Sequence, residues 1–185
     1  MLADLALLIA LCAPAVHPAT ALAVVAHESG GNPWAVGING AHASSQPTTR
    51  QQAVSLATTM LAKGYSVDVG YAQINSATLK KLGLSIEQGF EPCINLKAMQ
   101  TVLTRNYAIA AGRLGNGQPA LQAALSAYNT GNMNAGLRNG YVRAVYRLRA
   151  RNTRSAVSEI GSNVMCITEA GNKVWPSTFN HLLKE

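Results

Sequence analysis

Residues 18–32 read PATALAVVAHESGGN, a stretch that predicts a helix ending in an acidic residue. Pro18 is tolerated in the first turn of a helix, because the amide hydrogen it lacks has no partner there. The residues that follow are rich in Ala, Leu and Val, and two consecutive glycines then stop the helix. A helix is therefore expected from Ala19 to Glu28, with Glu28 in its last turn.

Two features of this helix favour a protonated Glu28. Val24 and Val25 lie four and three residues before it, on the same face. That face must be buried for the helix to be stable, and burial raises the pKa of a carboxyl group. The negative end of the helix dipole also disfavours a charge at this position. Glu28 is therefore a candidate general acid, and the alternative is an exposed glutamate at a helix end.

The rest of the chain is also expected to be mostly helical. Thr49 has the spacing of a capping box with the glutamine three residues later, and Asn95 is expected to cap a longer helix. Residues 35–49 are expected to form a loop, and the alternation at 65–69 suggests a short extended piece. The further helices are expected at about 50–63, 76–82, 95–114, 118–128 and 141–149.

The composition suits one globular domain with a basic surface. The chain has 185 residues, 48% of them hydrophobic, which excludes a disordered chain. Its net charge is +7, and no acidic residue lies between Glu91 and Glu159, whereas six arginines lie between Arg138 and Arg154. Such a charge favours an anionic partner such as nucleic acid, a membrane surface or cell wall, and the alternative is a solvated helical face. Only 5% of the residues are aromatic and no nucleic-acid motif is present, so no nucleic-acid partner is expected.

The chain has an apolar segment near its N-terminus and a weakly patterned segment at its C-terminus. Residues 5–12, LALLIALC, are apolar but too short for a transmembrane span, which needs about 20 residues. No Lys or Arg precedes them, and a small-residue cleavage site at 21–23 would remove the start of the predicted Glu28 helix, so they are read as mature sequence. Residues 151–185 are weakly patterned, and they are expected to be a C-terminal extension that is either flexible or partner-binding.

The cysteines and histidines do not predict a metal site. Cys12, Cys93 and Cys166 contain no CxxC pair, and they permit three different disulfides or three free thiols. His27 and the glutamate after it begin an HExxH pattern, but Gly31 stands where the second histidine should be. Neither a metal nor another cofactor is therefore expected.

Four short motifs resemble those of soluble lytic transglycosylases, lysozyme-like enzymes that cleave peptidoglycan. They are ESGGNP at 28–33, GYAQIN at 70–75, AYNTG at 127–131 and YVRAV at 141–145. Each is weak alone, but their order and spacing are specific. The resemblance implies a mainly α fold of the goose-type lysozyme class with at most a short β element. It also implies a catalytic domain at residues 1–150, followed by the extension at 151–185.

The resemblance also implies roles for particular residues. Glu28 matches the single catalytic acid and base of the family. Gln73 and Asn129 match polar groups that bind the sugar and its N-acetyl arm. Tyr128 and Tyr141 match tyrosines near the catalytic glutamate. The candidate substrate-binding residues are thus Gln73, Asn129, Tyr128 and Tyr141.

The flanking residues resemble one branch of that family more closely. Three segments are similar to those of the transglycosylases of type IV secretion and conjugation machines: CAP at 12–14, DVG at 68–70 and PCINL at 92–96. This implies a periplasmic enzyme that opens the wall for a trans-envelope assembly, with secretion components as partners. It also implies a disulfide between Cys12 and Cys93. Two departures stand out: Tyr71 and Ala72 replace Leu and Met of the second motif, and residues 37–67 form a longer insert.

The implied reaction needs one carboxyl group. Glu28 would protonate the glycosidic oxygen between N-acetylmuramic acid and N-acetylglucosamine, and then take a proton from the C6 hydroxyl as a 1,6-anhydro ring closes. Most glycosidases use two carboxylates. Asp68 is the acid nearest to the second motif, but nothing in the sequence places it opposite Glu28. The alternatives are a hydrolytic muramidase and a peptidoglycan-binding secretion scaffold without activity.

Overall fold

The computed structural model describes residues 2–41, 45–151, 166–167 and 173–174. The chain divides into two units, Met1–Arg149 and Ala150–Glu185. In the second unit, β4 (Cys166–Ile167) pairs antiparallel with β5 (Lys173–Val174). The other residues of the expected C-terminal extension, from 152 onward, lie outside the described part of the chain.

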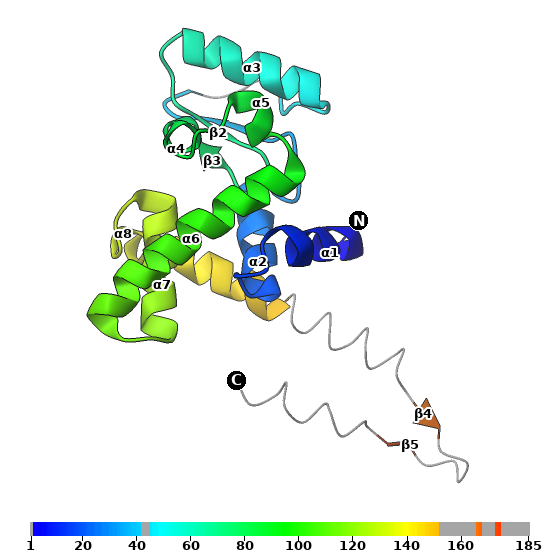
Figure 1. The fold of residues 1–185 in the computed structure, drawn as a ribbon, viewed down its shortest axis with the longest axis vertical. Helices are drawn as coiled ribbons and strands as arrows, with labels where there is room; N and C mark the ends of the chain where they lie inside the picture. Colours follow the sequence, from blue (N-terminus) through cyan, green and yellow to red (C-terminus); the bar gives the residue numbers. More distant parts are fainter. Residues whose placement is uncertain (1, 42–44, 152–165, 168–172, 175–185) are drawn as a thin grey trace. The chain divides into compact units, whose positions relative to one another are not determined.

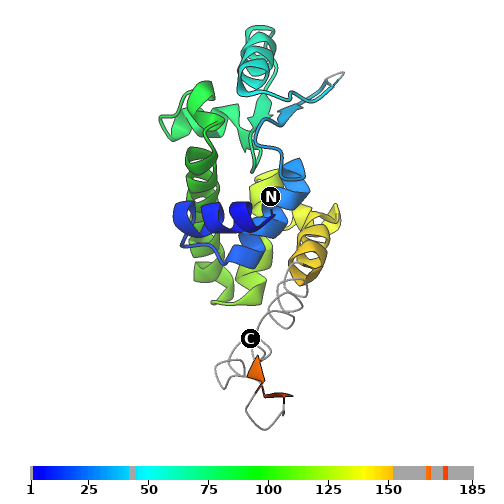
Figure 2. The ribbon, with the colours of Figure 1, turned by 90° about the vertical axis from the view of Figure 1, so that its right-hand side faces the viewer.

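The first unit is mainly helical, and its longest helix is α6. α6 contacts α7, α1, α5 and β3. Figures 1 and 2 show the sheet with α3, α4 and α5 toward one end of α6, and α7 and α8 toward the other end. The helices are α1 (Leu2–Cys12), α2 (Pro18–Ser29), α3 (Arg50–Ala62), α4 (Ser76–Lys81), α5 (Ile86–Gly89), α6 (Pro92–Leu114), α7 (Gln118–Thr130) and α8 (Ala135–Arg138), and residues 141–151 are also helical.

A small antiparallel sheet lies between α2 and α4 in the sequence. Its strands are β1 (Val36–Ile38), β2 (Val67–Val69) and β3 (Ile74–Asn75), in the order β1-β2-β3. The central strand pairs Asp68 with Gly37 on one side and with Asn75 on the other. The prediction that 35–49 is all loop is therefore wrong at β1, because that strand forms only against an edge supplied by residues far along the chain.

The start of α6 differs from the prediction. The helix begins at Pro92 rather than at Asn95, and Asn95 is fully buried inside it. The Asn95 amide nitrogen donates to the carbonyls of Val69 (2.9 Å) and Gly89 (2.7 Å), and its oxygen accepts from the Ala72 amide at 2.8 Å. Asn95 therefore joins α6 to the end of β2, to the turn between β2 and β3 and to the end of α5, instead of capping a helix.

A disulfide joins α1 to α6. Cys12 at the end of α1 is bonded to Cys93 in the first turn of α6, 81 positions later. Ile9 and Cys12 are buried, so the apolar N-terminal segment packs into the core. Within the described residues, no helix is both long and apolar enough to cross a bilayer.

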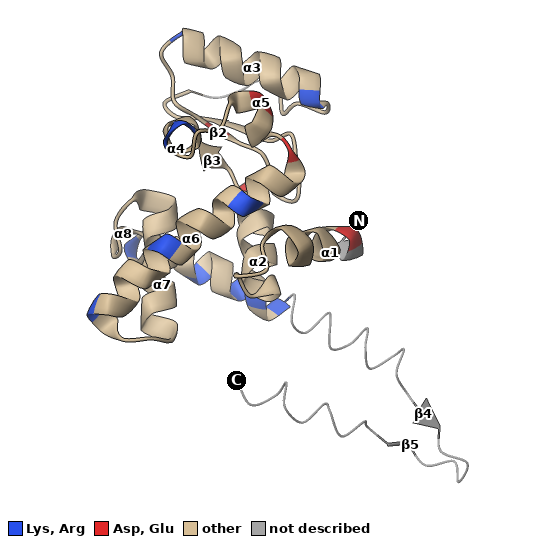
Figure 3. Cartoon of the chain, viewed as in Figure 1, with Lys and Arg blue, Asp and Glu red and all other residues tan. Residues whose placement is uncertain are grey.

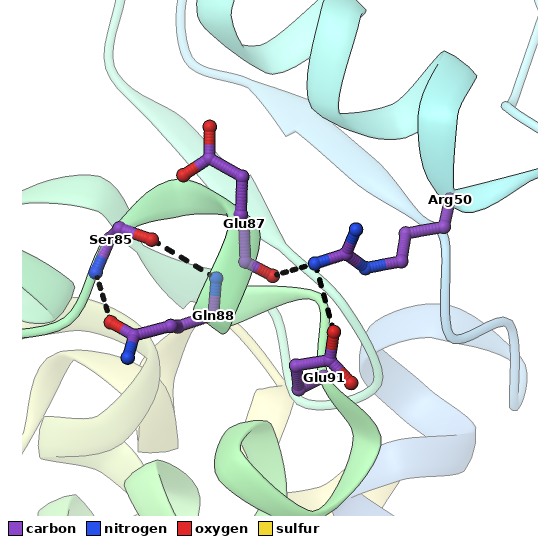
Figure 4. A network of polar contacts seen from close by, with 5 residues as sticks. All are labelled: Arg50, Ser85, Glu87, Gln88 and Glu91. Atoms are coloured by element: carbon purple, nitrogen blue, oxygen red, sulfur yellow. Dashed lines mark hydrogen bonds and ion pairs between the residues drawn. The ribbon is translucent and has the colours of Figure 1, made fainter.

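The insert between the first two motifs packs Ala53 and Ala57 of α3 into the core, and polar contacts also hold the start of α3. The Arg50 guanidinium at the start of α3 donates to the Glu87 carbonyl at 3.1 Å and pairs with the Glu91 carboxylate at 2.8 Å (Figure 4). Ser85 and Gln88 form a reciprocal capping box that fixes α5, which carries Glu87. Because both charges of the ion pair are partly exposed, its contribution is about 1 kcal/mol at most. The pair therefore orients α3 more than it stabilises the fold.

Candidate active site

Glu28 lies in the last turn of α2, where the sequence predicts it. Gly30 follows with a left-handed φ of 62°, and its amide donates to the Ala26 carbonyl, which ends the helix. Val24 and Val25 are fully buried one turn earlier, and the Glu28 side chain is itself mostly buried. A short turn of helix therefore carries the carboxyl group from the apolar core to the edge of a cleft.

The cleft has a volume of about 870 Å³. This is within the range of about 300–1,000 Å³ typical of ligand sites. It lies against α2, the sheet, α4, α6 and the end of α7. Four of the predicted site residues line it: Glu28, Gln73, Tyr128 and Asn129.

Tyr141 reaches Glu28 from the first turn of the helical residues 141–151. Its hydroxyl donates to Glu28 Oε1 at 2.6 Å. The tyrosine is 4% exposed, and its ring makes an edge contact with His27, with centroids 4.8 Å apart. Burial and the nearby Glu28 charge raise the pKa of Tyr141, so its hydroxyl stays a hydrogen-bond donor. The structure thus joins the first and fourth motifs at one carboxyl group.

Glu28 has a strongly raised pKa. Burial is the largest cause, and the charge of Asp68 adds to it, while the hydrogen bond from Tyr141 acts in the opposite direction. The result is a pKa of about 7, against an ordinary value of 4.5. A large part of the Glu28 population therefore carries a proton at neutral pH, as a general acid must.

Asp68 lies in the same cleft as Glu28. Its two carboxylate oxygens accept one amide each, Oδ1 from Asn75 at 2.8 Å and Oδ2 from Asn39 at 2.9 Å. The sequence did not place Asp68 near Glu28, although the alternation before the GYAQIN motif was a signal for a hairpin there. In that hairpin Asp68 and Asn75 are cross-strand neighbours.

Gln73 supports the turn between β2 and β3. Its φ is 47°, in the left-handed region that residues other than glycine rarely adopt. Its amide nitrogen donates to the carbonyls of Ala35 (3.1 Å) and Gly70 (3.0 Å). A Cβ added to Gly37 would come within 2.8 Å of Gln73 Oε1, so the glycine leaves room for this side chain. Sugar binding by Gln73 stays a prediction.

Tyr128 and Asn129 come from the last turn of α7. The Tyr128 hydroxyl donates to the Ala72 carbonyl at 2.6 Å. Burial raises the pKa of Tyr128, and the charges of Glu28 and Asp68 raise it further. Asn129 Oδ1 accepts from the Asn139 amide at 3.0 Å. The structure therefore brings the second and third motifs to the same cleft as Glu28, and the contacts of these residues with sugar stay predictions.

Two cations that were not predicted as site residues also line the cleft, Lys81 on α4 and Arg105 on α6. No motif marks either residue. Among the described residues, no three His, Cys, Asp or Glu side chains come together in a way that could hold a metal ion.

A comparison with protein families agrees with this arrangement. Residues 7–146 match the model of the transglycosylase SLT domain. The chain belongs to this family. The match spans all four motifs completely, the last of them at 141–145. The expected fold, a mainly α lysozyme-like domain with a short β element, is therefore confirmed for this SLT domain.

Several curated relatives share a large part of the SLT domain. The chain is 40% identical over 128 residues to the type IV secretion system protein virB1 of Brucella abortus and to that of Brucella suis, covering 69% of this chain and 54% of each relative. It is 37% identical over 134 residues to protein virB1 of Agrobacterium fabrum, covering 72% of this chain and 54% of the relative. The chain thus spans about half the length of these relatives. No solved structure matches it.

Proposed function

We propose that this SLT domain is a peptidoglycan lytic transglycosylase. It cleaves the β-1,4 bond between N-acetylmuramic acid and N-acetylglucosamine and leaves a 1,6-anhydro ring on the muramic residue. The observation that carries the proposal is Glu28, a buried carboxyl group with a pKa of about 7 at the edge of an open cleft. Membership of the transglycosylase SLT domain family supports it.

In the first step Glu28 acts as the acid. Its proton goes to the glycosidic oxygen, and the bond from C1 of the muramic residue to that oxygen breaks. The electron pair of the bond stays on the oxygen of the leaving sugar, and the N-acetyl group of the muramic residue stabilises the positive charge at C1. The Tyr141 hydroxyl occupies Glu28 Oε1, which leaves Oε2 to carry the proton.

In the second step Glu28 acts as the base. Its carboxylate takes the proton from the C6 hydroxyl of the muramic residue, and the C6 oxygen bonds to C1 and closes the anhydro ring. The carboxyl group regains the proton that it gave, so no water is consumed. A group with a pKa near the working pH suits both steps, because it is neither a very weak acid nor a very weak base.

One observation favours a second candidate, a hydrolytic muramidase. Asp68 shares the cleft with Glu28, and most hydrolytic glycosidases use two carboxyl groups. However, both Asp68 oxygens accept amides from Asn39 and Asn75, so neither is free of a partner. We therefore assign Asp68 an electrostatic effect on Glu28 and keep hydrolysis as the alternative.

The proposal includes a place and a purpose for the reaction. The relatives from Brucella are named as type IV secretion system proteins, and we infer that this SLT domain opens the wall for such an assembly. The disulfide between Cys12 and Cys93 supports a periplasmic location, because disulfides persist in oxidising compartments.

The test is a digest of purified peptidoglycan analysed by mass spectrometry. We expect muropeptides one water lighter than hydrolysis products, and none of them from the Glu28→Gln variant. Reducing-end products would instead show a muramidase. If the folded wild-type protein released no product, the catalytic proposal would be wrong and the scaffold alternative would gain support.

A further inference from the structure

The charges of the cleft are separated between its walls. The acids are Glu28 on α2 and Asp68 on β2, whereas the cations are Lys81 in the last turn of α4 and Arg105 in the middle of α6. Figure 3 shows Lys and Arg positions in blue on α4 and α6. The part of the cleft formed by these two helices is therefore positively charged.

The two cations are available to a ligand. Both side chains are exposed. The ion pair between Arg50 at the start of α3 and Glu91, the residue before α6, involves neither of them. The Asp68 oxygens already accept amides from Asn39 and Asn75. In the described part of the chain, no ion pair joins Lys81 or Arg105 to either acid of the cleft.

The polar residues around the cations complete a binding surface. Thr78 lies one turn before Lys81 on α4, and Thr101 lies one turn before Arg105 on α6. Asn106 follows Arg105, and all of these residues line the same cleft. Hydroxyl and amide groups beside two cations suit a ligand that carries a carboxylate together with peptide groups.

The sugars of a stem-bearing peptidoglycan strand carry no charge that could pair with these cations. Neither N-acetylglucosamine nor the ring of N-acetylmuramic acid is charged, since the lactyl carboxyl of the latter is joined to the peptide stem. The negative charges of the polymer are the free carboxylates of that stem. A cationic wall within the cleft therefore matches the stem and not the glycan.

We infer that Lys81 and Arg105 form a subsite for the carboxylates of the peptide stem, so that the cleft selects stem-bearing glycan over bare glycan. This inference rests on the proposed function, because it takes peptidoglycan as the ligand. It deepens that function by naming the form of the polymer that binds best.

A binding assay tests the inference without needing turnover. The parent protein is Glu28→Gln, which is expected to bind without cleaving. The two ligands are soluble N-acetylglucosamine–N-acetylmuramic acid tetrasaccharides, one with the peptide stem and one, the bare ligand, whose lactyl carboxyl groups are capped as uncharged amides. The test variant adds Lys81→Gln and Arg105→Gln. The control variant instead adds Lys97→Gln and Arg113→Gln, which remove two exposed charges of α6 outside the cleft.

We expect the test variant to bind the stem-bearing ligand about 3–20-fold more weakly than the parent, as two exposed ion pairs allow. Its affinity for the bare ligand and the affinities of the control variant should stay unchanged. Added salt should weaken only the stem-bearing complex. Unchanged binding of the bare ligand also shows that the test variant is folded.

Two results would overturn the inference, and they are distinguishable. An equal loss of affinity for both ligands, or no loss for either, would show that Lys81 and Arg105 do not bind the carboxylates of the stem. The proposed function would not be affected by that result. Failure of the parent itself to bind either ligand would reject peptidoglycan as the substrate, and the subsite with it.

Discussion

Burial of Glu28 in the cleft lowers the free energy of unfolding when its carboxyl group is ionised. Its pKa is about 7 in the folded protein and near 4.5 when it is exposed to water. Between these two values the folded state binds more protons at this residue than the unfolded state does. The stability contribution of Glu28 therefore falls as the pH rises from about 4.5 to about 7, and it is then fully unfavourable above that range.

Replacement of this carboxyl group should consequently stabilise the protein at high pH. Glu28→Gln keeps the side-chain size and an oxygen that can accept from Tyr141. We expect its free energy of unfolding to exceed that of the wild type by about 1–3 kcal/mol at pH 8. At pH 4 the glutamate of the wild type is mostly protonated and the glutamine of the variant is uncharged. The two proteins should therefore have the same free energy of unfolding. Urea unfolding at the two pH values measures this, and an equal difference at both would contradict the assigned pKa.

Asp68 should act on Glu28 through its charge. The charge of Asp68 raises the pKa of Glu28, so Asp68→Asn should lower that pKa. A general acid is lost as the pH rises through its pKa, and the alkaline limb of kcat/KM should therefore move to lower pH. The control is Glu91→Gln, which removes the same charge outside the cleft and should leave the limb in place. An unmoved limb in Asp68→Asn would mean that Asp68 only joins the strands.

At the scale of secondary-structure elements, Asn95 connects α6 to the sheet. Its side chain satisfies two buried carbonyls and one buried amide. Asn95→Ala leaves all three without a partner, so we expect a loss of at least about 2 kcal/mol in the free energy of unfolding. Thr101→Ala, which removes one exposed bond within α6, should cost about 0.5 kcal/mol or less. Similar losses in the two variants would contradict this role of Asn95.

The sequence predicts elements well where their signals are local. The Pro18 start and the glycine stop of α2 lie within the helix or beside it, and Thr49 caps α3 as predicted, accepting from the Gln52 amide at 3.3 Å. β1 and the role of Asn95 depend on partners far along the chain. Asn95 has the chemistry of a helix cap, and only the folded structure shows that buried carbonyls use its amide instead.

The same distinction applies to the candidate site. The motifs identify Glu28 and Tyr141, and the structure joins them by a hydrogen bond although 113 positions separate them. Asp68 lies in the DVG motif, which implies no role for it in the cleft, and Lys81 and Arg105 belong to no motif. All three reach the cleft because the strands pair and because α4 and α6 form one wall. Residue types alone therefore could not predict that these three side chains line the cleft.

At the scale of the whole molecule, the excess of positive charge gathers partly on the helical residues 141–151 (Figure 3). Arg143 and Arg147 lie one turn apart there, and both are exposed. We expect Arg143→Glu with Arg147→Glu to reduce cosedimentation with cell-wall sacculi, because the wall is anionic. The control, Lys63→Glu with Arg113→Glu, changes the net charge equally at other exposed positions. Equal losses would mean that net charge alone, and not this face, drives binding.

The proposed reaction depends on one property of the protein, the proton that Glu28 carries near neutral pH. Carboxyl carbon NMR of protein labelled at glutamate measures it directly, and the signal of Glu28 is identified by its absence in Glu28→Gln. We expect this signal to titrate with a pKa of about 7, above the ordinary range of a glutamate. Titration near the ordinary value of 4.5 would contradict the proposed reaction, because Glu28 would then be ionised when the reaction needs its proton.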